Sequence, residues 1–262
     1  MSCFKEACDY RKFESDVKFK SRYIRNSSVE NFLSALHSSS LSRKISLPKD
    51  TVLWRSQLGK VESDNVPWEE RVFHDNSPMP FPKDRMKPPK NRALEGRANP
   101  KGIAYLYLAM DQNTAMAEVR PFIGSEISLG SFLTMKDLSL VDCTRQPETT
   151  RSSIDTKKEP LDELIWAEIG RAFSEPITVS DYTPDYLPTQ IIAELFKNKD
   201  FDGVKYKSSL SEGCNIVLFD PNAAEMTHCF LYKAKDPKFI FEEVEGACYA
   251  TQHAKSLNQK ST

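Results

Sequence analysis

The sequence NPKGIAYLYLAMDQNTAMAEVRP, residues 99–121, places a strand and a helix in immediate succession. Apolar and aromatic residues from Ile103 to Ala109 predict the strand. Asp111 or Asn113 can cap a helix that runs from Thr114 to about Arg120. Because that helix begins with mostly small residues, we expect it to lie close against a neighbouring strand. This segment therefore decides how sheet and helix meet.

Strands and helices are interspersed along the rest of the chain. Strand-like runs lie at Thr51–Ser56, twice within Ser128–Asp142, and at Val204–Tyr206, Asn215–Phe219, Met226–Lys233 and Phe239–Val244. Helical patterns lie at Leu161–Phe173 and Tyr186–Lys197. Since few of these elements follow the βαβ spacing of a parallel sheet, the pattern favours an α+β fold over a doubly wound one.

The chain divides into three parts. Residues 1–48 form an N-terminal helical segment, in which Ser28 is expected to cap a second helix and residues 41–50 to form a polar link. Residues 49–246 form the main domain, and residues 247–262 form a polar C-terminal tail. The N-terminal segment is either an appendage packed on the main domain or an arm that binds a partner.

A long polar stretch rich in proline, residues 59–100, follows the first strand of the main domain. Loops of this length inside a compact domain are usually functional or disordered. Trp68, Phe73 and Phe81 are too apolar for a wholly disordered linker. We therefore interpret this stretch as a partly ordered loop that folds over the surface near the site.

The composition excludes several classes of protein. Lysine plus arginine (36) nearly balances aspartate plus glutamate (37), and the formal net charge of −1 argues against direct nucleic-acid binding. The six cysteines include no CxxC pair and the four histidines are scattered, so no metal site is expected. No stretch approaches the about 18 apolar residues of a membrane span, and no signal peptide is evident. We expect a cytoplasmic protein with reduced cysteines.

Four side chains offer chemistry that suits a nucleotide sugar. Arg55 lies in an apolar strand, where an unpaired arginine is costly to bury, and its guanidinium can bind phosphate in a bidentate way. Glu118 lies on the helix of small residues, and a carboxylate beside a glycosidic carbon stabilises oxocarbenium-like charge. Tyr107 and Ser208 lie in or at the end of strands. No His or Asp arrangement makes Ser208 a nucleophile, so we expect it to bind a phosphate or ribose.

Three sequence blocks resemble those of a known family. They are LWRS at residues 53–56, the block from Arg97 to Arg120, and FDGVKYKSSLSEGCNIVLF at residues 201–219. In order, they resemble the signature blocks of RES-domain proteins, which are named for their Arg, Glu and Ser, and the resemblance covers about residues 50–232. It implies an ADP-ribosyltransferase-like fold, with a mixed β core and flanking helices, and an activity that breaks down NAD. It also implies a protein antitoxin of the helix-turn-helix type or another regulator, and a possible homodimer.

The resemblance assigns roles to individual residues. The catalytic set that it implies is Arg55, Glu118 and Ser208, and the substrate-binding set comprises Tyr107, Tyr105, Arg97, Asn99 and Asn215. Ser208 and the adjacent Ser209 point to opposite faces, so only one can serve, and the family pattern favours Ser208. Tyr105 lies on the same strand face as Tyr107 and is the alternative to it.

Three functions are compatible with these residues. The first is an NAD-consuming toxin or antiphage defence effector that cleaves the nicotinamide–ribose bond, as a glycohydrolase with water as acceptor or as a phosphorylase with phosphate. The second is an ADP-ribosyltransferase that modifies a protein or nucleic acid. The third is a non-catalytic module that senses a nucleotide. NAD would be the substrate, and no separate cofactor is expected. The sequence leaves the acceptor open.

Overall fold

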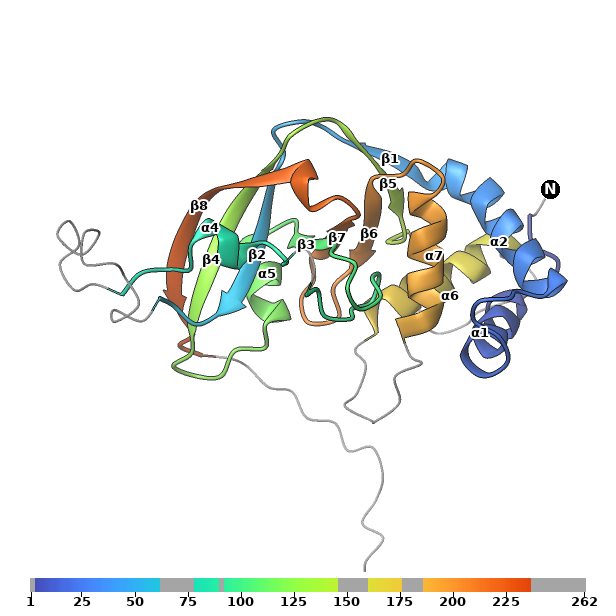
Figure 1. The fold of residues 1–262 in the computed structure, drawn as a ribbon, viewed down its shortest axis with the longest axis horizontal. Coiled ribbons are helices and arrows are strands. Elements are labelled where there is room, and N and C mark those ends of the chain that lie inside the picture. Colours follow the sequence, from blue (N-terminus) through green and yellow to red (C-terminus); the bar gives the residue numbers. More distant parts are fainter. Residues whose placement is uncertain (1–2, 62–77, 90–91, 146–159, 176–185, 237–262) are drawn as a thin grey trace, which may run out of the picture.

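The computed structural model describes residues 3–61, 78–89, 92–145, 160–175 and 186–236. Eight strands form one mixed sheet in the order β1-β5-β6-β7-β3-β2-β4-β8, and the described residues add six α-helices around it (Figure 1). The α+β fold class, with a mixed β core and flanking helices, is confirmed. No helix in these ranges is long and apolar enough to cross a membrane.

The elements have the following bounds. The strands are β1 (Lys44–Leu47), β2 (Val52–Leu58), β3 (Leu106–Ala109), β4 (Glu126–Thr134), β5 (Leu138–Asp142), β6 (Gly203–Lys207), β7 (Cys214–Leu218) and β8 (Ala224–Lys233). The helices are α1 (Asp9–Phe19), α2 (Ser27–Ser40), α4 (Lys83–Met86), α5 (Gln112–Glu118), α6 (Leu161–Ser174) and α7 (Leu187–Lys197).

The sheet narrows at the junction of β2 and β3. These two strands pair only at Trp54 and Ala109, whereas β2 pairs with β4 along seven residues, from Val52 to Leu58. Among the described strands, β5 and β6 run parallel and the other neighbouring pairs are antiparallel. The sheet therefore consists of two parts, β2-β4-β8 and β1-β5-β6-β7-β3, joined at one narrow point (Figure 1).

The N-terminal helices share a core with the main domain. Figure 1 shows α1 and α2 beside α6 and α7 at one end of the molecule. Phe32 and Leu36 of α2 belong to the same buried cluster as Trp166 of α6 and Phe196 of α7. Leu36 and Phe196 are fully buried. Burial of this much apolar surface makes the N-terminal segment a packed part of the fold.

Three expectations about the elements were wrong. Residues 41–50, expected to be a polar link, include β1, whose Ile45 and Leu47 pair with Leu140 and Leu138 of β5 and so extend the sheet. The cap of α2 is Asn26 instead of Ser28, because the Asn26 side chain accepts the hydrogen bond from the amide of Val29.

The expected strand Ile103–Ala109 begins only at Leu106. Gly102 has a positive φ of 90° and the amide of Ile103 bonds to the carbonyl of Pro100, so the chain is still turning there. The expected strand Phe239–Val244, Trp68 and Phe73 lie outside the described residues.

Candidate active site

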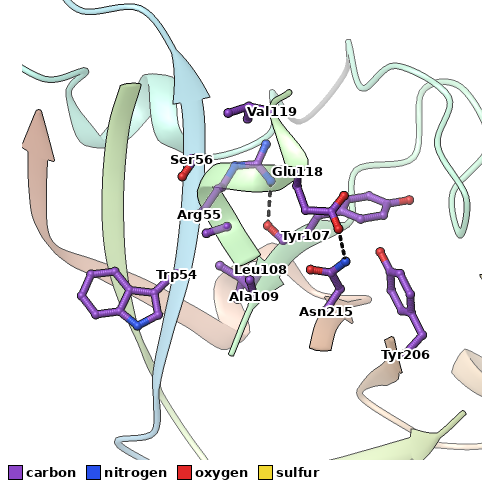
Figure 2. A pocket seen from close by; sticks show the side chains of 11 residues that line it. Trp54, Arg55, Ser56, Tyr107, Leu108, Ala109, Glu118, Val119, Tyr206 and Asn215 are labelled. Atoms are coloured by element: carbon purple, nitrogen blue, oxygen red, sulfur yellow. Dashed lines mark hydrogen bonds between the residues drawn. The ribbon is translucent and has the colours of Figure 1, made fainter. Parts of the chain in front are cut away.

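A pocket opens where β2 and β3 separate (Figure 2). Its cavity volume is about 140 Å³. It is lined by Trp54, Arg55, Ser56, Tyr107, Leu108, Ala109, Ala115, Glu118, Val119, Tyr206 and Asn215. The three sequence blocks, which lie far apart along the chain, therefore meet at one place. Of the expected site residues, Arg55, Tyr107, Glu118 and Asn215 line the pocket directly.

Glu118 is the last residue of α5, and the N-terminus of this helix is capped by Asp111. The carboxylate of Asp111 accepts hydrogen bonds from the amide and hydroxyl of Thr114 at 2.8 and 2.7 Å. Ala115 is buried against Ala109 and Leu129, and its small side chain lets α5 lie close to the sheet. The expected helix therefore begins two residues earlier than Thr114, and Asp111 is its cap.

One oxygen of Glu118 receives two hydrogen bonds. The hydroxyl of Ser208 donates to Oε1 at 2.7 Å, and the amide of Asn215 donates to the same oxygen at 2.6 Å. Asn215 is buried in β7, whereas Ser208 follows the end of β6 and is half-buried. Within the part of the chain that the structure describes, Oε2 accepts no hydrogen bond, so this oxygen remains open to a ligand.

Arg55 bridges the gap between the separating strands. Its Nη1 donates to the main-chain oxygen of Tyr107 at 2.9 Å, while its Nε is buried without a hydrogen-bond partner among the described residues. Burial lowers the pKa of Arg55 to about 10, which still leaves the side chain charged at neutral pH. A half-buried cation with no carboxylate partner among the described residues is costly, so the arrangement suits an anionic ligand.

The ring of Tyr107 lines the pocket, whereas its hydroxyl forms hydrogen bonds with residues outside the pocket. The hydroxyl donates to Oδ1 of Asn99 at 2.7 Å and accepts from the amide of Ala98 at 3.0 Å. Burial raises the pKa of Tyr107, so the group stays protonated. Tyr105, the alternative, is 2% exposed, packs on Phe219 and does not line the pocket.

Arg97 and Asn99 do not line the pocket, although both were expected at its mouth. Asn99 is buried, and its amide donates to the main-chain oxygens of Leu94 and Ile103. Arg97 donates to the main-chain oxygen of Glu175. Both residues support the loop that holds the hydroxyl of Tyr107. Ser209 is exposed, whereas Ser208 contacts Glu118.

Tyr206 was not identified from the sequence. It is 5% exposed and lies opposite Asn215 in the pairing of β6 with β7. Figure 2 shows its hydroxyl pointing toward Asn215 and Glu118. Burial raises the pKa of Tyr206, and the negative charge of Glu118 adds to the effect, so the hydroxyl is a donor at neutral pH. The sequence could have indicated Tyr206, because it lies two residues before Ser208 and residues two apart in a strand point to the same face.

The loop between β6 and β7 docks on the N-terminus of α5. The hydroxyls of Ser211 and Thr114 lie 3.0 Å apart. A Cβ atom on Gly213 would lie 2.1 Å from Oγ1 of Thr114 and 2.2 Å from Oδ2 of Asp111. The absence of a side chain at Gly213 therefore allows this close approach, which also sets Ser208 beside Glu118 at the other end of the helix.

The arrangement combines an oriented carboxylate, a cation and aromatic walls. Oε1 of Glu118 is fixed by two donors, and Arg55 adds positive charge to the lining of the same pocket. Such a site can bind an anionic ligand and stabilise positive charge that develops beside the carboxylate. The described residues contain no group of three or more His, Cys, Asp or Glu side chains able to hold a metal ion.

Comparison with known proteins gives one family and one solved structure. A chain of the crystal structure of the M. tuberculosis MbcT–MbcA toxin–antitoxin complex is 13% identical, with a TM-score of 0.41, over 76% of this chain and 92% of that one. No curated protein matches. The model of the RES domain matches residues 69–239, which is more than half of the chain. The chain belongs to the RES-domain family.

Proposed function

We propose that this protein is an NAD-consuming enzyme that cleaves the bond between nicotinamide and ribose, with water or phosphate as the acceptor. The observation that carries the proposal is the environment of Glu118. Two donors hold one oxygen of this carboxylate and leave the other open, in a pocket that also contains Arg55, whose Nε is buried. Membership of the RES-domain family supports the same reading.

The proposed reaction needs little covalent chemistry from the protein. The bond between the ribose carbon and the ring nitrogen breaks, and its electron pair goes to nicotinamide, which becomes neutral. Positive charge then develops on the ribose, and the carboxylate of Glu118 stabilises it. An oxygen of water forms a bond to the same carbon and water releases a proton to the solvent, which gives ADP-ribose. Alternatively, an oxygen of phosphate forms that bond and gives phosphorylated ADP-ribose. Arg55 binds the anionic part of the substrate.

Incubation of the purified protein with NAD, with and without phosphate, tests the proposal. We expect release of nicotinamide, and the identity of the sugar product separates the acceptors. ADP-ribose indicates water, phosphorylated ADP-ribose indicates phosphate, and label on protein or nucleic acid indicates the transferase. Intact NAD under all conditions would contradict the proposal and favour a non-catalytic module.

We also propose that another protein restrains the activity in the cell, because uncontrolled loss of NAD would be lethal to the cell that makes the enzyme. Expression of this chain alone should arrest growth and lower cellular NAD. Expression of Glu118→Gln should do neither. Growth arrest by both proteins would show that toxicity arises elsewhere than at this pocket.

A further inference from the structure

Arg55 retains hydrogen-bonding capacity that none of the described residues uses. One terminal nitrogen bonds to the carbonyl of Tyr107, and the buried Nε has no partner in the described part of the chain. Among the described residues, no Asp or Glu forms an ion pair with Arg55. A guanidinium has five N–H donors, so its binding capacity in this pocket is largely unused.

A second arginine lies nearby on α4. This short helix packs against β2, on the proline-rich stretch that connects β2 to β3 (Figure 1). The amide of Gln57 donates to the main-chain oxygen of Arg85 at 2.8 Å. Gln57 follows Arg55 by two residues on the same strand, so its side chain leaves the same face of the sheet. The guanidinium of Arg85 lies over the ring of Phe81, 5.2 Å from its centroid.

The two arginines repel one another. Burial is the main cause of the lowered pKa of Arg55, and the positive charge of Arg85 acts in the same direction. Arg85 is exposed, and within the described ranges it has no acidic partner. This repulsion is unfavourable in the absence of a ligand, and a bound anion relieves it.

The size of the pocket determines how much of a dinucleotide it can hold. Pockets that enclose a whole small-molecule ligand have volumes of about 300–1,000 Å³. The volume here is about 140 Å³, which suits a ring and part of a sugar. The remainder of the ligand must therefore extend along the surface, and α4 packs against β2, the strand that carries Arg55.

We propose that Arg55 and Arg85 together bind the diphosphate of a dinucleotide substrate, with Arg55 at the pocket and Arg85 outside it. This inference rests on the proposed function for the identity of the ligand. Arginine suits the role because each planar guanidinium can bind two phosphate oxygens at once. Arg85 thereby gives the proline-rich stretch a role in substrate binding.

Calorimetric titration with inorganic pyrophosphate tests the site without any turnover. Arg85→Gln should weaken pyrophosphate binding about tenfold, which corresponds to about 1.4 kcal/mol. Lys83→Gln is the matched control, since it removes one positive charge from the same helix. Lys83 pairs with Glu225 of β8, which Lys87 also contacts, so the helix should remain in place. Equal pyrophosphate binding by wild type and Arg85→Gln, or no binding by wild type, would overturn the inference.

Turnover measurements separate this inference from the proposed function. Arg85→Gln should raise KM for NAD about tenfold and leave kcat nearly unchanged, since the diphosphate lies away from the reacting bond. NAD consumption with an unchanged KM in Arg85→Gln would overturn the inference and leave the function standing. Pyrophosphate binding that depends on Arg85, without any NAD consumption, would contradict the proposed function and leave the anion site of Arg55 and Arg85 standing. If Arg85→Gln changed only the dependence of the rate on inorganic phosphate, the inference would also be overturned, because Arg85 would then bind the phosphate acceptor instead of the diphosphate of the substrate.

Discussion

The amide of Asn215 donates a 2.6 Å hydrogen bond to Oε1 of Glu118, although 97 residues separate the two in sequence. Asn215 is 5% exposed and lies on β7, between β6 and β3, so its position is set by the middle of the sheet. Glu118 ends a helix of only seven residues and is itself exposed. The strand therefore orients a carboxylate that the helix alone would leave free to rotate.

Asn215→Asp should reduce NAD turnover more than Asn215→Ala does. The alanine variant loses one donor to Glu118, whereas the aspartate variant places a second carboxylate within hydrogen-bond distance of it, and like charges disfavour ionisation of the pair. We expect at least a tenfold difference in kcat between the two variants at neutral pH. Equal activity of both would show that the charge at this position is unimportant.

Glu118→Gln should keep the fold and lose most NAD turnover. The side-chain oxygen of glutamine can still accept from Ser208 and Asn215, so the change mainly removes the charge. Loss of such a charge costs about 2 to 4 kcal/mol of transition-state stabilisation. Single-turnover rates measure the effect, and an unchanged melting temperature is the control. Wild-type turnover by the folded variant would rule out the proposed role of Glu118.

Arg55→Lys should not preserve NAD binding. A lysine keeps one positive charge, but it cannot bond to the carbonyl of Tyr107 and bind two phosphate oxygens in one plane. Calorimetry with NAD measures the loss, and an unchanged melting temperature is the control for correct folding. Near-normal affinity in the lysine variant would show that the charge alone is sufficient.

Gly213→Ala should disturb the site from a distance. Its added Cβ would overlap Oγ1 of Thr114 and Oδ2 of Asp111, which form the cap of α5. Loss of such a cap costs about 1 kcal/mol, and the displaced loop should draw Ser208 away from Glu118. Urea unfolding and kcat measure the two effects. Ser209→Ala, at an exposed position in the same loop, should leave both unchanged.

Leu36→Ala should destabilise the whole domain. Leu36 is fully buried in the cluster that α2 shares with α6 and α7, so a cavity there should cost about 2–5 kcal/mol. Denaturant unfolding should show one transition at a lower midpoint. Leu41→Ala, at a position that is 60% exposed, is the control. If only a minor separate transition moved, the N-terminal helices would be an independent arm.

Local patterns were sufficient to predict several elements. The strand around Arg55, the helices that became α6 and α7, and the helix that carries Glu118 all follow short-range rules of periodicity and capping. The prediction of a polar link at residues 41–50 was wrong. The edge strand β1 is stabilised by pairing with β5, and its own sequence shows little of the alternation that identifies a strand.

The α+β class was predictable from the sequence because it depends on the periodicity and spacing of apolar residues, and three short blocks carry the resemblance to the RES-domain family. Which residues meet in the pocket followed from the way the strands and helices pack. Tyr206 joined the site because β6 pairs with β7, and Asn99 moved into a supporting role because it bonds to the hydroxyl of Tyr107. Asn215 and Glu118, which lie 97 residues apart in the sequence and bond to one another in the pocket, give the physical reason: side chains from distant strands and helices meet when the sheet forms, and no local pattern encodes that contact.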